Sequence, residues 1–227
     1  SIDDALAAGK EQLKGHSNDP SKVAIVLSAQ HSNEDNFALA TLAKAFLGVG
    51  DFFVTGRALG HGDDILMSED KNPNTAGVLA LTGGKAKPFA DLAFAIKEGK
   101  VGALIALGSA IGNPNDASAL KDVKSFVALS THDGPIAGAA AVVLPTSSWA
   151  EADGTFVNRL GLWQESDRAI TPQGGSRPAY RWVQELAKTL GLVLPWKKVA
   201  ELRAASNKAT ESSAVATPSV APPTGAQ

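Results

Sequence analysis

The chain has 227 residues, 44% of them hydrophobic, with no cysteine and a formal net charge of −2. A chain of this length holds one large or two small domains, and its weak charge argues against nucleic acid or an anionic membrane surface as a partner. It can form neither a disulfide nor a cysteine-ligated iron–sulfur cluster of its own, and no uncharged apolar run approaches the ~20 residues of a membrane-spanning helix.

In the first part of the chain, helix-like segments alternate with short apolar runs. Residues 2–14 have helix-forming composition, and residues 23–27 read as a strand buried on both faces. Ser32, with an acid three residues later, predicts a helix start, and Gly48 predicts its end. A second short strand is predicted at residues 52–55.

The next stretch has less regular patterning. Residues 56–76 are rich in Gly, Asp and Asn without a usable period, which predicts a long surface loop of the kind that often carries function. Residues 78–81 form an apolar run that fits a short strand or one helical turn. Pro88 predicts the start of a helix that ends near Glu98.

The second part of the chain repeats the alternation. Strands are predicted at 101–107, 126–129 and 141–144, and helices at 117–123, 177–190 and 196–206. Short apolar strands separated by helices favour an α/β fold, with a Rossmann-like parallel sheet and helices on both faces.

Three segments are predicted along the chain. Residues 1–20 form a helical lead-in, residues 21–206 form the α/β domain, and residues 207–227 form a disordered Ala/Ser/Pro-rich tail. Because the chain begins with Ser1 instead of Met, we expect it to be a piece of a longer protein.

The four histidines do not indicate a metal site. His16, His31, His61 and His132 lack metal-ligand spacing to one another, so no metal ligand is predicted. His31 and His132 each follow a predicted strand, where parallel sheets place their ligands. The simpler interpretation is a solvated histidine in each loop.

Neither the glycine-rich turns nor the serines predict catalysis. Residues 108–114 follow a strand, and their backbone N–H groups could hold an anion, but the chain lacks a dinucleotide fingerprint and a phosphate-binding loop. A plain strand-to-helix turn explains this segment equally well. Ser147 and Ser148 lie near Glu151 in sequence, and with His132 they suggest a hydrolase, yet no nucleophile elbow is present. No catalytic residue is predicted.

The segment after the last predicted strand resembles a known family. Its residues follow the pattern ADVVLPAxxxxEKDGTFTNxEGRxQ of the molybdopterin oxidoreductase superfamily, at Ala141 to Pro145, Glu151, Asp153 to Phe156, Asn158, Gly161 and Gln164. Residues 178–191 resemble the continuation RPxWxIxxELAxxLG of that family, and residues 101–114 resemble one of its strand-and-turn units. The resemblance covers roughly residues 20–191.

The resemblance implies a role in an oxidoreductase. Enzymes of this family hold a molybdopterin guanine dinucleotide across the strand ends, whereas the large iron–sulfur subunit of respiratory complex I keeps the framework without that cofactor. Leu160 and Leu162 replace a Glu and an Arg of the family pattern, which favours the complex I branch and suggests a surface now packed with apolar groups. The branch implies a structural C-terminal domain of NADH–quinone oxidoreductase that supports electron transfer without its own cofactor or catalysis.

Partners and location follow from the same resemblance. The expected partners are the iron–sulfur-bearing N-terminal portion and other peripheral-arm subunits, with iron–sulfur clusters and FMN held elsewhere in the complex. We expect no nucleic acid partner and no direct membrane span. The expected location is the cytoplasmic, inner face of the plasma membrane, as part of a membrane-bound complex.

Two alternatives stay open. A molybdopterin-dependent oxidoreductase, like formate dehydrogenase or nitrate reductase, would use Gly108, Asn113, Thr131 and Asp133 to bind the cofactor. A stand-alone binding domain would instead hold a nucleotide-like ligand at the turns 108–114 and 131–134.

The framework interpretation also sets expectations for single residues. Glu151 and Asp153 would accept backbone hydrogen bonds, Gly154 would adopt a positive φ, and a buried Asn158 would bridge turn backbone.

Overall fold

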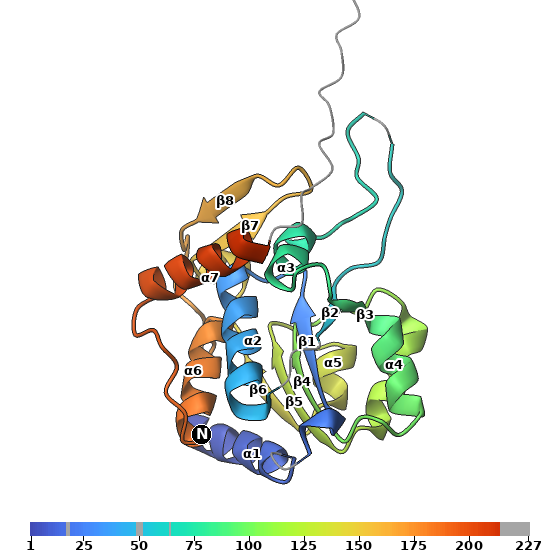
Figure 1. Ribbon diagram of the computed structural model, residues 1–227, viewed down its shortest axis with the longest axis vertical. Helices are drawn as coiled ribbons and strands as arrows, with labels where there is room; N and C mark the ends of the chain where they lie inside the picture. Colours follow the sequence, from blue (N-terminus) through green and yellow to red (C-terminus); the bar gives the residue numbers. More distant parts are fainter. Residues whose placement is uncertain (17–18, 49–51, 64, 214–227) are drawn as a thin grey trace, which may run out of the picture.

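Six parallel strands form one sheet in the order β3-β2-β1-β4-β5-β6 (Figure 1). The computed structural model describes residues 1–16, 19–48, 52–63 and 65–213. The predicted α/β fold with a Rossmann-like parallel sheet is confirmed. The strands are β1 (Val23–Ser28), β2 (Phe53–Thr55), β3 (Lys87–Pro88), β4 (Ala103–Leu107), β5 (Ser125–Ser130) and β6 (Val142–Pro145).

The central strands are the apolar runs that the sequence predicts. Every residue of β1 and β4 is buried, because helices cover both faces of the sheet. The chain builds β2 and β3 on one side of β1 and then crosses to β4 on the other side. The crevice between the carboxyl ends of β1 and β4 is therefore the topological switch point, where open parallel sheets bind ligands.

Helices cover the two faces unequally. One core contains apolar residues of α1 (Ile2–Lys14), α2 (Asn33–Leu47), α3 (Thr75–Leu81), α6 (Ala179–Thr189) and α7 (Val199–Ser213). The opposite core contains residues of α4 (Phe89–Lys97), the 3₁₀ segment η2 (Pro114–Asp122) and α5 (Pro135–Ala139). Two further 3₁₀ turns are η1 (Pro20–Lys22) and η3 (Trp149–Glu151).

Helix α2 confirms the predicted start and stop signals. The Ser32 hydroxyl accepts a hydrogen bond from the Asp35 N–H at 3.2 Å, and Gly48 ends the helix with a left-handed φ of 65°. This cap fixes the first turn of α2 beside the switch point, so it positions the side chains that begin the helix.

The local structure departs from the prediction after β6. The stretch after β6 contains an antiparallel hairpin, β7 (Gly154–Val157) with β8 (Trp163–Ser166), that the sequence did not indicate. For residues 78–81 the helical alternative is correct, since they belong to helix α3.

The C-terminal helix also differs from the prediction. Helix α7 runs to Ser213, so the tail predicted to start at residue 207 is helical over its first seven residues. The buried residues Leu202, Ser206 and Thr210 recur every four positions and face α2 and α3. Tertiary packing therefore extends the helix through an Ala/Ser-rich segment. The rest of the predicted tail, residues 214–227, lies outside the described residues.

No helix in the described ranges combines the length and the apolar character needed to cross a membrane.

Candidate functional site

A cavity of about 410 Å³ opens at the carboxyl ends of β1, β4, β5 and β6. Its lining comes from the turns that follow these strands, from the start of α2 and from the segment between β6 and β7. The size lies within the range of ligand pockets, which is roughly 300–1,000 Å³. The position is the one that the sheet topology predicts for a ligand.

Two buried titratable side chains enter the cavity wall from the start of α2. His31 contacts the Ser28 hydroxyl through Nδ1 at 3.0 Å, while its Nε2 is buried without a hydrogen-bond partner. Asp35 accepts a hydrogen bond from the Tyr180 N–H at 2.8 Å. Both residues lie in the wall because the Ser32 cap starts the helix directly after β1.

Burial changes the protonation of both groups. It lowers the pKa of His31 to about 4, with a further contribution from the nearby positive charge of His132. It raises the pKa of Asp35 to about 7, against the hydrogen bond from Tyr180 and with help from the negative charge of Glu34. At neutral pH the cavity wall therefore holds an uncharged imidazole beside a carboxyl group that is partly protonated.

The segment after β6 completes the wall. Ser147 is buried, and its hydroxyl has no hydrogen-bond partner among the residues that the structure describes. Trp149 is exposed at the rim, and Gly154 approaches from β7. Ser109 links the two neighbouring turns, since its hydroxyl contacts the hydroxyls of Ser130 at 2.7 Å and Thr131 at 3.2 Å.

The structure does not bring the four predicted cofactor residues together. Thr131 and Asp133 line the cavity, as do both histidines that follow predicted strands, His31 and His132. Asn113 lies in a second, more open cavity of about 520 Å³, where it also caps η2 by accepting a hydrogen bond from the Asn115 N–H at 3.1 Å.

Gly108 occupies its position for a steric reason. Its φ is 109°, and a Cβ there would lie 2.8 Å from the Ser28 hydroxyl oxygen. The glycine thus allows the end of β4 to pack against β1. The sequence did not identify Asp35 as a cavity residue. The feature that could have indicated it is the position of Asp35 at the capped start of a helix that directly follows a buried strand.

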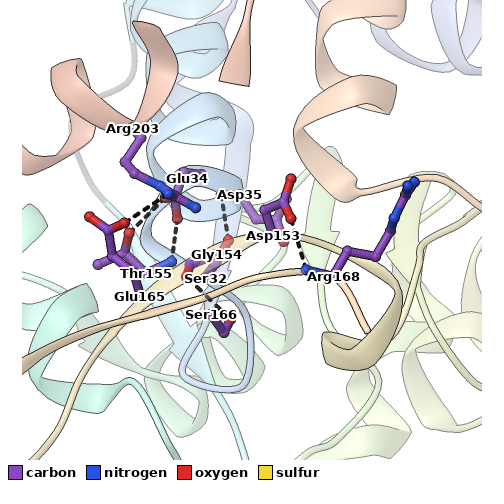
Figure 2. A network of polar contacts seen from close by, with 10 residues as sticks. All are labelled: Ser32, Glu34, Asp35, Asp153, Gly154, Thr155, Glu165, Ser166, Arg168 and Arg203. Atoms are coloured by element: carbon purple, nitrogen blue, oxygen red, sulfur yellow. Dashed lines mark hydrogen bonds and ion pairs between the residues drawn. The ribbon is translucent and has the colours of Figure 1, made fainter. Parts of the chain in front are cut away.

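A second cluster of polar residues joins the start of α2 to the β7–β8 hairpin and α7, and its side chains bond to one another (Figure 2). The Glu34 carboxylate is fully buried and accepts hydrogen bonds from the Thr155 N–H and hydroxyl, both at 2.8 Å. Arg203 of α7 donates to Glu34 at 2.9 Å and to Glu165 at 2.9 Å. We call Glu34, Thr155, Glu165 and Arg203 the interlock, because it joins α2, the hairpin and α7.

The two acids of the 141–164 segment that match the family pattern also bind backbone, as predicted. Glu151 accepts hydrogen bonds from the Ser148 N–H at 2.8 Å and the Gln173 N–H at 3.0 Å, and the bonds from Ser148 lead the causes that lower its pKa. Asp153 accepts from the Arg168 N–H at 2.8 Å.

Other expectations for this segment need correction. Gly154 has no positive φ; glycine is needed because a Cβ there would lie 2.7 Å from the Ser32 Cβ. Asn158 does bridge turn backbone, accepting from the N–H groups of Leu160 and Leu162, but it is half-buried and not buried. Both leucines are 58% exposed, so they do not form a packed apolar surface within this chain. The hairpin turn carries them away from the core.

The cavity lining is a poor match for a molybdopterin guanine dinucleotide. Of its charged residues, Asp35, Asp133 and Asp153 are acids and Arg57 is the one strong base. A pyrophosphate group favours arginine, lysine and free backbone N–H groups, so this excess of carboxyl groups opposes it. The unpartnered His31 and Ser147 atoms suit an uncharged hydrogen-bonding group, but the set as a whole does not fit the anionic dinucleotide.

Within the described residues, no group of three or more His, Cys, Asp or Glu side chains is placed to hold a metal ion.

Fold and cavity together define a Rossmann-like α/β domain with a crevice at its topological switch point. The family model described as molybdopterin oxidoreductase matches residues 70–189, which is more than half of the 227 residues, and the chain belongs to that family.

Two curated relatives come from different branches. One is the mitochondrial NADH-ubiquinone oxidoreductase 78 kDa subunit of Candida albicans, 32% identical over 80 residues, which is 35% of this chain. The other is the F420-dependent formate dehydrogenase 2 subunit alpha of Methanococcus maripaludis, 37% identical over 73 residues, which is 32% of this chain. Each match covers 11% of the relative's length, so it concerns a small part of those proteins.

Among solved structures, acetylene hydratase from Pelobacter acetylenicus matches with a TM-score of 0.44 and 24% identity, over 57% of this chain and 22% of that one.

Proposed function

We propose that the chain is a structural domain of the large iron–sulfur subunit of an NADH–quinone oxidoreductase. In this role it supports the cluster-bearing portion and the peripheral-arm subunits while electrons pass from NADH through FMN and iron–sulfur clusters to quinone. The domain supplies no redox centre and no catalytic residue. It works at the cytoplasmic face of the membrane as a peripheral part of the complex.

One observation carries this proposal: four polar residues, at the start of α2 and between residues 151 and 155, bind the chain itself. Glu34 and Thr155 serve the interlock, and Glu151 and Asp153 each hold a loop through backbone N–H groups. Side chains committed to internal hydrogen bonds position backbone and are not free to bind a substrate. The relative from the NADH-ubiquinone oxidoreductase branch and the acidic cavity lining agree with a framework role.

A second candidate is a domain of a molybdopterin-dependent oxidoreductase. Two observations favour it: the formate dehydrogenase relative, and a cavity at the switch point with unpartnered polar atoms on His31 and Ser147. In that case Thr131 and Asp133, which line the cavity, would contact the cofactor. The acid excess of the lining counts against this candidate.

Analysis of the intact enzyme separates the two. The chain is tagged in its native host and the enzyme that contains it is isolated. Its subunits are identified, and flavin, iron, molybdenum and pterin are quantified per chain. The framework role predicts flavin and iron with no stoichiometric molybdenum. One molybdenum and at least one pterin per chain would overturn it and support the second candidate.

A further inference from the structure

Exposed apolar side chains concentrate on two projections. Of the thirteen large hydrophobic side chains that are exposed in the described ranges, seven lie on these projections. The first, which we call the arm, is residues 57–63 and 65–72; it leaves the body after β2 and returns before α3 (Figure 1). The second is the β7–β8 hairpin with its turn at residues 158–162.

Hydrogen bonds between its two limbs give the arm a defined shape. The Gly60 N–H donates to the Glu69 carbonyl at 2.8 Å, and the Asp63 N–H donates to the Met67 carbonyl at 2.9 Å. The Lys71 ammonium binds the carbonyl oxygens of His61 and Ser68, both at 2.6 Å. The arm is therefore a surface loop, as predicted, whose own hydrogen bonds hold its shape.

The tip of the arm is capped from inside. One oxygen of Asp63 accepts hydrogen bonds from the N–H groups of Ile65, Leu66 and Met67 at 2.8, 2.6 and 2.9 Å, and these bonds lower the pKa of Asp63. The tip backbone thus needs no external partner for these donors. The Ile65 and Leu66 side chains are 85% and 87% exposed, so the capped turn presents apolar groups to its surroundings.

The hairpin turn presents a matching surface. Leu160 and Leu162 are exposed at the positions where the family pattern has a Glu and an Arg, and Trp163 is exposed beside them. Asn158 holds this turn by accepting hydrogen bonds from the N–H groups of both leucines. As on the arm, internal hydrogen bonds fix a turn whose side chains are apolar.

The two projections are joined at their roots. Asn74, which is buried where the arm meets α3, accepts a hydrogen bond from the Val157 N–H of β7 at 2.8 Å. It also donates to the His31 carbonyl at 2.8 Å. The arm and the hairpin therefore leave the body side by side, from one fixed point near the carboxyl ends of the strands.

The chemistry of this face describes its partner. Burial of large apolar side chains stabilises a complex, and exposed apolar groups of this kind mark interaction sites. The sequence of residues 57–72 carries four acids and two strong bases, so this stretch has a net negative charge. A partner with apolar recesses rimmed by lysine or arginine complements both features.

We propose that the arm tip and the hairpin turn form one docking face for a neighbouring protein region of the same oxidoreductase. The proposal rests on the proposed function, since that function supplies the larger enzyme. The matched segments make up 11% of each curated relative, so most of such an enzyme lies outside the corresponding region. The occupant is a polypeptide surface with apolar recesses and a basic rim.

The absence of cysteine from the chain allows a site-specific test. Leu66→Cys and Leu160→Cys report on the docking face, and Val193→Cys, at a side chain 94% exposed between α6 and α7, is the matched control. Each variant is purified from the native host as the intact enzyme. Alkylation at the new cysteine is timed by peptide mass spectrometry, and a thiol-to-amine cross-linker is attached at residue 66 to capture a lysine of the basic rim.

We expect residues 66 and 160 to react at least tenfold more slowly than residue 193, with a cross-link from residue 66 to a lysine outside this chain. Equal reactivity at all three positions would overturn the proposal, as would a cross-link between two copies of this chain or purification without any partner. The proposed function fails separately, if the protected enzyme contains molybdenum and pterin in place of flavin.

Discussion

Glu34 and Asp35 are neighbours in the first turn of α2, and both are buried, yet their surroundings differ completely. Glu34 has an arginine partner and two hydrogen bonds from Thr155. Asp35 receives a backbone hydrogen bond from Tyr180 and no ion pair from any described residue. The first carboxylate connects three elements, and the second faces a cavity with its pKa raised to about 7.

The start of one helix therefore supplies one carboxyl group that holds the framework together and another that faces the cavity. A buried charge costs several kcal/mol unless a partner compensates it, so the interlock stabilises only as a complete set. A buried carboxyl group without a cation relieves the cost by holding its proton, which keeps it responsive to pH. Substitutions at these carboxyl groups and at the residues around them test the contrast, starting with the largest expected effect.

The largest effect is expected from Arg203→Met. This change leaves the fully buried Glu34 without its cation and should cost ~3–5 kcal/mol, or roughly 6–20 °C in melting temperature. Lys208→Ala removes a positive charge from an exposed position of the same helix and should change stability by less than ~0.5 kcal/mol.

A double-mutant cycle checks the cause. Glu34→Gln with Arg203→Met should lose less stability than the sum of the single losses, because no unpaired charge remains. Chemical denaturation supplies all four free energies of unfolding. Additive losses would show that Arg203 acts through packing alone.

Asp35→Asn should stabilise the protein, whereas Arg203→Met should destabilise it. The folded pKa of about 7 lies above the ordinary value of 3.8, so Asp35 favours folding fully below pH 3.8 and loses that contribution as pH rises to 7. Asparagine keeps the acceptor for the Tyr180 N–H and removes the buried charge. We expect a gain of ~2–4 kcal/mol at pH 8 and little change at pH 4.

Denaturation curves at pH 4 and pH 8 test this expectation, with Asp91→Asn at an exposed position of α4 as the control. Equal effects of Asp35→Asn at both pH values would contradict the role of burial.

His31→Gln should make the folding stability depend more strongly on pH, because in the parent chain His31 offsets the contribution of Asp35. The folded pKa of about 4 lies below the ordinary 6.5, so His31 withdraws stability as pH falls from 6.5 to 4. Over the same window Asp35 adds stability, and the two slopes nearly cancel. His31→Gln should therefore gain ~2–3 kcal/mol in stability between pH 6.5 and 4, relative to the parent chain.

The reciprocal variant completes this comparison. Asp35→Asn should become less stable over the same pH window, because only the His31 slope remains. Parallel pH profiles for the parent chain and both variants would show that neither group titrates as its burial implies.

The smallest effect is expected from Asn158→Ala. The side chain holds the hairpin turn but is half-buried, and water can replace its bonds to Leu160 and Leu162. We expect a loss of ~1 kcal/mol by thermal unfolding, against no measurable change for Asn115→Ala at an exposed position of η2. A loss above ~3 kcal/mol would show that the turn supports the core.

The sequence predicted the sheet because β1, β4 and β5 are continuous apolar runs, and it predicted α2 because its cap and stop are local signals. It missed the β7–β8 hairpin, whose strands are four residues each and whose turn lacks a short Gly-rich signature. Residues 78–81 were ambiguous for the same reason of length. Helix α7 overran its predicted end because packing, not composition, extends it.

The sequence could predict those site residues whose location depends only on their place directly after a strand. The first cavity is lined by four residues that follow strands: His31, Thr131, His132 and Asp133. Asn113 also follows a strand but lines the second cavity. The interlock was not predictable, because its partners are 121 and 169 residues apart in sequence. Chemistry that depends on such distant pairs becomes visible only when the fold is known.

The separation between Glu34 and Arg203 also has a consequence for how the protein is made. Synthesis runs from the amino terminus, so the ribosome releases α2 long before the guanidinium 169 residues later exists. Until Arg203 has been synthesised, the carboxylate of Glu34 lacks the cation that pairs with it in the core. A chain that terminates before Arg203 keeps that defect and remains a target for proteases, so the interlock distinguishes chains that contain α7 from chains that end before it.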